Sequence, residues 1–261
     1  MKIVGNDIKF IKISDTDLIN NIMEQGFFEA NVLQTAVNVL QGIQRGTVLD
    51  IGANMGSFTI PLAYYNPQYT FIAFEPQRMV YYQLCGNVAI NKLNNVLVHN
   101  VALGSERTQF LIDMPDYENE SNIGAFSLDK EVREHDDYLC KTNGVKQKVD
   151  VFKLDEKILD TDIVLIKIDV EGMELDVIKG GLALLKNNNY PPILFESWES
   201  KPWFKPRRQE LFEFLEDLGY EITSFGEDNL AIHQGEKKIG RAHVWTPVTD
   251  VSRMPSSAWK K

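Results

Sequence analysis

Two patterns of apolar residues take turns along the chain: helical spacing and short, continuously apolar runs. The two patterns follow one another several times before residue 200. Residues 27–43 carry apolar side chains at helical spacing, and the short run "TVLDIG" that follows is continuously apolar, as in a buried parallel strand. Similar runs are "YTFIAFEP", "VLVHNVALGS", "DIVLIKIDVEG" and "PPILFESWE", and helical patterns over 57–65, 78–92 and 173–185 stand between them. This order predicts an α/β fold with a doubly wound, mostly parallel sheet.

Other segments predict additions to this sheet. Residues 3–13 read as a hairpin with "GND" at its turn, and residues 106–161 read as a small antiparallel insertion. Residues 207–218 form an amphipathic helix pattern, and "YEITSF" and "NLAIH" follow it as an antiparallel edge pair.

The pattern indicates one main domain. We assign residues 1–27 to an N-terminal extension, 28–236 to the α/β domain and 237–261 to a tail outside it. The stretch "IGRAHVWTPVT" in this tail is similar to a translated sequencing adapter and suggests a cloning artefact. A genuine flexible tail is the alternative, given its Pro, Ser and Thr content.

The composition of the chain indicates which kinds of binding partner and which cellular compartment to expect. The chain has 261 residues, 44% hydrophobic, with a formal net charge of −10, so we expect no nucleic-acid partner. Cys85 and Cys140 lie far apart, which favours reduced thiols over a disulfide framework. With no apolar leader and no run long enough to span a membrane, we expect a cytoplasmic protein without a membrane partner. The oligomeric state is left open.

The stretch "VLDIGANMG" carries the first candidate site. Gly52 and Gly56 follow a strand and precede a helix, which places backbone N–H groups near a ligand at the carboxyl edge of the sheet. A dinucleotide loop would have a glycine where Asn54 stands, and Asp50 puts a negative charge at the loop. An acid suits an ammonium better than a phosphate, which favours S-adenosylmethionine over a nicotinamide cofactor.

Four further carboxylates end strands of the predicted sheet. Glu75 ends the next strand, 19 residues after Gly56, where it can accept both hydroxyls of an adenosine ribose. Asp169 and Glu171 in "IKIDVEG", and Glu196 in "LFESWE", meet the same edge. Unpaired acids at a desolvated sheet edge are energetically costly, so their presence suggests that they bind a ligand. For Asp169 and Glu171, the alternative to ligand binding is capping of the helix that follows.

Together these motifs resemble a known family. "VLDIGANMGSFT", "FIAFEP", "NVAIN", "VALGS", "LIKIDVEGMELDVIKGG" and "PPILFES" are similar to FkbM-type class I S-adenosylmethionine-dependent methyltransferases, over roughly residues 28–200 and more loosely to 235. The resemblance implies a Rossmann-like seven-stranded sheet whose last strand inserts antiparallel. It also implies O-methylation, often of sugars or natural products.

The resemblance assigns roles to the matching positions. Asp50, Gly52, Asn54 and Gly56 would line the methionine part of the cofactor, Glu75 would hold the ribose, Asn100, Val101 and Ala102 would face the adenine, and Asp169 would sit beside the sulfonium and the acceptor.

The predicted function is O-methylation of a hydroxyl on a sugar, glycan or small natural product. Asp169, Glu171 and Glu196 are the candidate bases for the hydroxyl proton. The same three acids suit Mg²⁺, but base plus caps is the favoured interpretation, so we assign no metal. The alternatives are a catalytically silent cofactor-binding protein and a nicotinamide-dependent oxidoreductase.

Overall fold

The computed structural model describes residues 2–4, 7–12, 28–117, 123–124, 126–135, 142–159 and 161–235. Most of the predicted extension, Cys140 and the whole of the predicted tail lie outside these residues, so the domain limits stay predictions. Among the described residues, no helix is long and apolar enough to cross a membrane.

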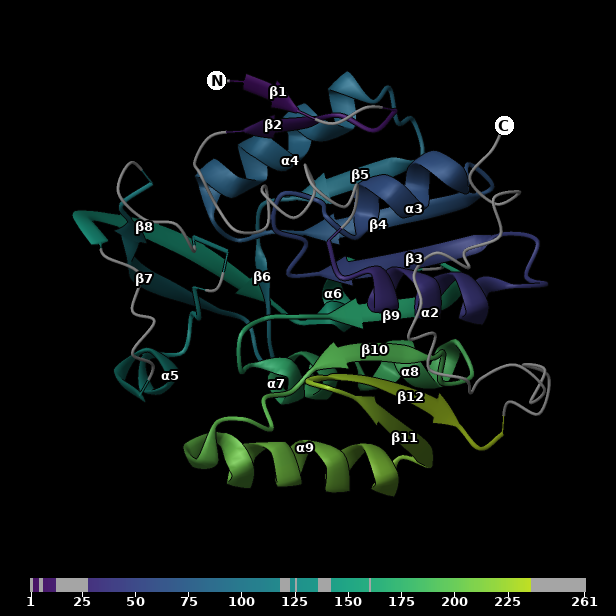
Figure 1. Ribbon diagram of the computed structural model, residues 1–261. Coiled ribbons are helices and arrows are strands. Elements are labelled where there is room, and N and C mark those ends of the chain that lie inside the picture. Colours follow the sequence, from purple (N-terminus) through teal and green to yellow (C-terminus); the bar gives the residue numbers. More distant parts are fainter. Residues whose placement is uncertain are drawn as a thin grey trace.

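A seven-stranded sheet forms the centre of the molecule (Figure 1). Its order is β11-β12-β10-β9-β3-β4-β5, and the pairs from β10 to β5 are parallel. Its strands are β3 (Gly46–Ile51), β4 (Tyr69–Phe74), β5 (Val96–His99), β9 (Ile163–Ile168), β10 (Ile193–Glu196), β11 (Tyr220–Phe225) and β12 (Asp228–His233). The predicted fold class is confirmed.

Helices cover both faces of the sheet because alternate strand residues point to opposite sides. On one face, Val48 and Phe71 pack with α2 (Ala30–Leu40) and α3 (Thr59–Tyr65), and Ala73 packs with α4 (Arg78–Ile90). On the other face, Leu49 and Phe74 pack with four further helices, which are α6 (Leu154–Lys157), α7 (Glu174–Lys179), α8 (Leu182–Asn187) and α9 (Lys205–Asp217).

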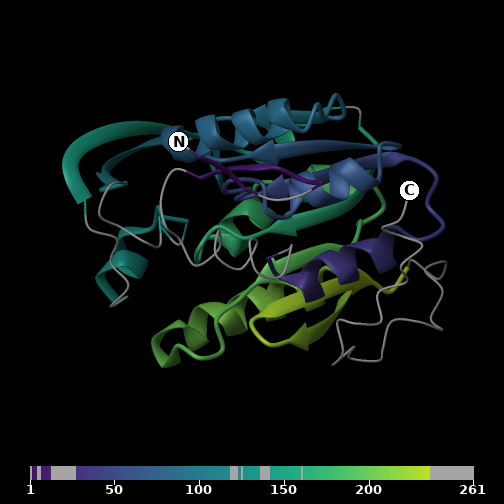
Figure 2. The same ribbon diagram turned by 45° about the horizontal axis from the view of Figure 1, so that its top comes forward.

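The structure confirms the N-terminal hairpin and the antiparallel insertion. β1 (Lys2–Val4) pairs with β2 (Phe10–Lys12), and the hairpin lies against α4, where Asn87 Oδ1 accepts the amide of Ile11 at 2.7 Å. The insertion is a three-stranded sheet of β6 (Ala102–Leu103), β8 (Thr142–Phe152) and β7 (Thr108–Pro115), with α5 (Lys130–His135) beside it. Figures 1 and 2 both show the β7–β8 pair projecting beyond the central sheet.

Three element predictions need correction. The predicted strand 96–105 divides between two sheets, as β5 and β6. The predicted helix 173–185 divides at Gly180 and Gly181 into α7 and α8, since glycine is a poor helix former. Gly180 also lies so close to the carbonyl of Gly104 that a side chain would overlap it. The predicted edge pair is half right: β11 is the edge strand, whereas β12 inserts antiparallel between β10 and β11.

Candidate active site at the carboxyl ends of the central strands

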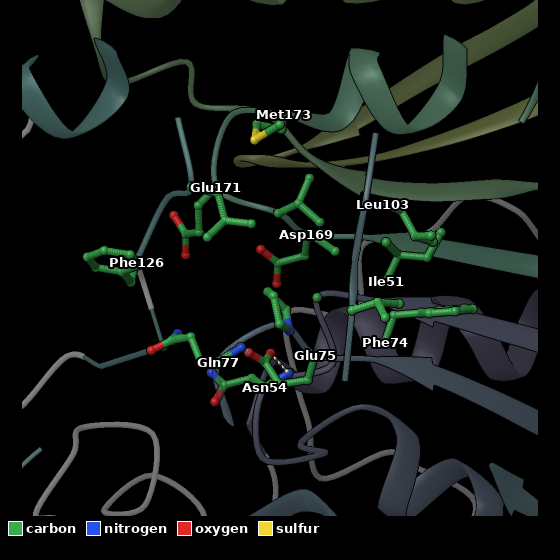
Figure 3. A pocket seen from close by; sticks show the side chains of 17 residues that line it. Ile51, Asn54, Phe74, Glu75, Gln77, Leu103, Phe126, Asp169, Glu171 and Met173 are labelled. Carbon is green, nitrogen blue, oxygen red and sulfur yellow. Dashed lines mark hydrogen bonds between the residues drawn. The ribbon is translucent and has the colours of Figure 1, made fainter. Parts of the chain in front are cut away.

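A pocket opens where β3, β4 and β9 end, at the point where the strand order reverses. Its walls come from the turns after these strands, from the β5–β6 segment and from the insertion. The labelled side chains in Figure 3 are Ile51, Asn54, Phe74, Glu75, Gln77, Leu103, Phe126, Asp169, Glu171 and Met173. The space between the walls is about 630 Å³, including open solvent at the mouth.

The glycine loop differs from the sequence expectation in one respect. All the amide N–H groups of residues 52–56 already have acceptors within the chain. These acceptors are the carbonyl of Phe74 for Gly52 and Ala53, Glu75 Oε2 for Asn54, Asn54 Oδ1 for Met55, and the carbonyl of Ala53 for Gly56. A loop with its donors used in this way is poorly suited to cradle a phosphate. The expectation that it offers N–H groups to a ligand is therefore wrong.

The two loop glycines have different neighbours. Gly52 lines the pocket with φ +83°, and a Cβ there would overlap the carbonyl oxygen of Asp169. Gly56 has φ +94° and does not line the pocket; a Cβ would come within 2.7 Å of Ile60 and Leu84. Gly52 thus lets the β3 and β9 turns approach closely, whereas Gly56 serves packing beneath the loop.

Glu75 is almost completely buried at the pocket floor. Its Oε2 accepts the amide of Asn54 at 3.0 Å, and its Oε1 accepts the amide of Gln77 at 2.8 Å. Burial raises the pKa of Glu75 to about 7 even though these amides favour its charged form. Each carboxylate oxygen keeps lone-pair capacity for a further donor.

Asp50 meets an ammonium from its own chain. Its side chain is fully buried, lies outside the pocket lining and accepts a hydrogen bond from Thr59 at 2.5 Å. Its Oδ1 lies 3.7 Å from Nζ of Lys167, whose ammonium also donates to Asp169 Oδ2 at 2.9 Å. Burial raises the pKa of Asp50 against the opposing effect of Lys167. A direct contact of Asp50 with a cofactor stays a prediction, and this geometry favours an indirect role.

The three predicted catalytic carboxylates lie together. Asp169, Glu171 and Glu196 each offer an oxygen within 4.8 Å of the others, and Asp169 and Glu171 also line the pocket. Nε1 of Trp198 donates to Glu196 Oε2 at 3.0 Å. Burial, and next the charges of Asp169 and Glu171, raise the pKa of Glu196 well above its usual value.

The turn after β9 depends on a residue that sequence reasoning missed. Glu174 is buried, and its Oε1 accepts the amides of Val170 at 3.2 Å and Gly172 at 3.1 Å. Burial raises the pKa of Glu174 to about 7. Glu171 lies between these amides with φ +58°, and Glu174 is the acid that holds both amides of this turn.

The predicted adenine segment divides in the structure. Val101 and Ala102 line the pocket, whereas Asn100 does not. The Asn100 amide donates to the carbonyls of Glu75 at 2.8 Å and Pro76 at 3.1 Å, which fixes the turn after β4.

The insertion supplies a wall that the sequence pattern did not reveal. Phe126 and Leu128 line the pocket, and the next residues are tied to α9. Arg207 bonds Asp129 at 2.5 Å and Glu131 at 2.7 Å. No local motif marks this contact, because it joins segments 76 or more residues apart.

The aromatic residues after β10 mostly cover the core. Trp198 and Phe204 are buried and pack with Val132 of α5. Trp203 is partly exposed and stacks with His135 at a centroid distance of 4.9 Å.

Comparisons with known proteins identify the family of this chain. The sequence matches the model of the Methyltransferase FkbM domain over residues 50–222. It is 27% identical to "Methyltransferase 1" of Beauveria bassiana over 144 residues, 51% of this chain and 57% of that protein. It is 28% identical to "Methyltransferase sdnD" of Sordaria araneosa over 208 residues, 67% of this chain and 74% of that protein.

A solved structure supports the fold. The putative caffeoyl-CoA O-methyltransferase from Staphylococcus aureus superposes with a TM-score of 0.50 at 11% identity, covering 84% of this chain and 91% of that one. The resemblance read from the sequence and the assignment of S-adenosylmethionine as cofactor are confirmed by the family match. The chain belongs to the FkbM methyltransferase domain family of S-adenosylmethionine-dependent methyltransferases.

Proposed function

We propose that this protein transfers a methyl group from S-adenosylmethionine to a hydroxyl oxygen of a sugar, glycan or small natural product. The observation that carries the proposal is the group of Asp169, Glu171 and Glu196 beside the pocket. An alcohol must lose its proton during methylation, and a carboxylate with a raised pKa is a suitable acceptor.

The pocket chemistry suits S-adenosylmethionine. This cofactor has cationic groups and no phosphate, and it supplies an electrophilic methyl group when bound. Asp169 beside Gly52 would face its cationic end, and Glu75 would accept ribose hydroxyls. The apolar side chains of Val101, Ala102 and Phe126 would cover the adenine. Asp50, Gly56 and Asn100 do not line the pocket, and their role would be to hold the pocket-lining residues in position.

Glu196 is our candidate for the general base. The acceptor oxygen bonds to the methyl carbon as the bond from that carbon to sulfur breaks, and the hydroxyl proton passes to the carboxylate of Glu196. Burial and the neighbouring acids raise the pKa of Glu196, which makes its ionised form a stronger base. Most of the remaining rate enhancement would come from positioning.

The first test is calorimetric titration with S-adenosylmethionine, S-adenosylhomocysteine and NAD. We expect both sulfur nucleotides to bind and NAD not to bind, because the loop has no unused amides for a pyrophosphate. Binding of NAD alone would restore the oxidoreductase alternative. Binding of the sulfur nucleotides without turnover on any acceptor would favour the silent cofactor-binding alternative.

The second test identifies the acceptor and the base. Glycans and small alcohols are incubated with donor labelled in its methyl group, and the products S-adenosylhomocysteine and methyl ether are measured together. For an active acceptor, we expect Glu196→Gln to lower kcat about 100-fold or more. The control is Glu199→Gln, because Glu199 is exposed three residues away. Equal kcat in the two variants would remove Glu196 as the base.

Magnesium is the alternative to a carboxylate base. Oxygen atoms from Asp169, Glu171 and Glu196 are close enough to share an ion, although Glu196 already accepts from Trp198. We expect turnover to persist in EDTA. Loss of turnover in EDTA that Mg²⁺ restores would transfer the role of the three acids to a metal.

A further inference from the structure

Lys167 is a charged residue inside the most apolar strand of the sheet. Its side chain is 8% exposed, and its register partner on the neighbouring strand β3 is Asp50. Burial alone lowers the pKa of a lysine, but the charges of Asp169, Asp50 and Glu29 outweigh burial and raise the pKa of Lys167. Lys167 is therefore held as an ammonium among carboxylates.

The ammonium joins a buried acid to the pocket. Thr59 donates to Asp50 Oδ2 at 2.5 Å, while Asp50 Oδ1 has no hydrogen-bond partner and lies 3.7 Å from Lys167 Nζ. The short contact of Lys167, 2.9 Å, goes to Asp169 Oδ2. Asp50 thus compensates the charge of Lys167 from outside the pocket lining, and Lys167 donates its short hydrogen bond to Asp169, which lines the pocket.

Asp169 is suited to receive a cation of the cofactor. Its backbone amide donates to the carbonyl of Ile51 at 2.9 Å. Its carbonyl oxygen lies so close to Gly52 that a Cβ at Gly52 would overlap it. Two other carboxylates line the pocket: Glu75, which already accepts one amide on each oxygen, and Glu171, two residues further along the turn. Asp169 lines the pocket, and Figure 3 shows its carboxylate facing the cavity.

We propose that Lys167 is a positioning residue that holds the Asp169 carboxylate against the ammonium end of S-adenosylmethionine. The inference rests on the proposed function only in its use of that cofactor. It needs no acceptor, so ligand binding tests it separately from methyl transfer.

Two probes isolate the amino-acid end of the ligand. S-adenosylhomocysteine and 5′-methylthioadenosine share the adenosine and the thioether sulfur, but the second carries a methyl group in place of the amino-acid chain. The ratio of their dissociation constants, measured by calorimetry, reports contacts to that chain. Binding of 5′-methylthioadenosine reports the rest of the pocket and the integrity of the fold.

The variants separate positioning from folding. Lys167→Met alone leaves Asp50 buried without a counter-charge and is expected to destabilise the fold. We therefore compare Asp50→Asn, which keeps the contact of Lys167 with Asp169, with the double variant Asp50→Asn/Lys167→Met. Adding Asp169→Asn to each of the two completes a double-mutant cycle between Lys167 and Asp169.

We expect the double variant to bind S-adenosylhomocysteine about 10-fold more weakly than Asp50→Asn, with unchanged binding of 5′-methylthioadenosine. Asp169→Asn should weaken S-adenosylhomocysteine strongly in the Asp50→Asn background and little in the double variant.

Three results would overturn the inference: full preference for S-adenosylhomocysteine in the double variant, equal losses for both probes, or additive effects of the Lys167 and Asp169 changes. Failure of methyl transfer with the expected binding pattern would overturn the proposed function alone.

Discussion

At the scale of single residues, the site depends on side chains and glycines that satisfy two requirements at once. Asn54 offers its amide to Glu75 and its side-chain oxygen to Met55, so it closes the loop while lining the pocket. Gly52 combines a left-handed backbone with contact against Asp169. Because such residues join the turns that follow neighbouring strands, the shape of the pocket depends on how closely these strands approach each other.

The Gly52→Ala variant tests this close approach. Alanine at Gly52 must adopt φ +83° and also overlap the Asp169 carbonyl, so we expect a loss of about 3 kcal/mol or more in the free energy of unfolding. Gly42→Ala is the control, since Gly42 has φ +86° with no atom within 4 Å of a built Cβ, and should cost about 1 kcal/mol. Urea unfolding measures both, and equal losses would contradict the contact.

At the scale of elements, the insertion reaches back over the pocket through its contact with α9. Val132 of α5 packs with Trp198 and Phe204, and Arg207 binds the acids on either side of Lys130. The wall formed by Phe126 and Leu128 therefore depends on a helix that lies far from it in the sequence.

The Arg207→Met variant tests this coupling. These ion pairs are partly exposed and stabilise the fold by about 1 kcal/mol at most, so the melting temperature should change little. The affinity for S-adenosylhomocysteine should fall about 5-fold as the wall loosens. Lys179→Met is the matched control, because Lys179 forms a partly exposed ion pair with Glu210 of α9 and neither residue lines the pocket. Equal affinities in the two variants would contradict the coupling.

At the scale of the whole molecule, buried acids at the carboxyl edge of the sheet set the pH dependence of stability. Burial raises the pKa values of Glu75 and Glu174 from 4.5 to about 7. The folded state then binds more protons than the unfolded state between these values, so the stability that these two acids contribute is full below pH 4.5 and is lost as pH rises through 7. His99, whose pKa is lowered by burial, opposes this trend.

We expect the free energy of unfolding, from urea titrations at pH 5.5, 6.5 and 7.5, to decrease by up to about 1.4 kcal/mol for each such acid between pH 5.5 and 6.5, and by less between pH 6.5 and 7.5, where the folded state also ionises. Glu174→Gln keeps the Oε1 that accepts both turn amides and should remove one share of this slope. Glu174→Ala removes the acceptor and should cost about 1–3 kcal/mol at every pH. A slope that is unchanged in Glu174→Gln would exclude Glu174 as its source.

The sequence by itself determined the elements and the edge where the site lies. The parallel strands were located from continuously apolar runs between helical patterns, since a strand buried on both faces is apolar throughout. Acids at the ends of these runs marked the carboxyl edge of the sheet. The motifs around Gly52 and Asp169 also identified the family and the cofactor. These features are local, so spacing along the chain is enough to reveal them.

Only the tertiary structure decided which of these residues face the pocket and what neutralises the others. Asp50 and Lys167 belong to different strands, and their pairing follows from register across the sheet, which local patterns do not encode. The same holds for the pocket wall that the insertion supplies. Burial and charge at a site depend on what the rest of the chain packs around it, and that is a property of the whole fold.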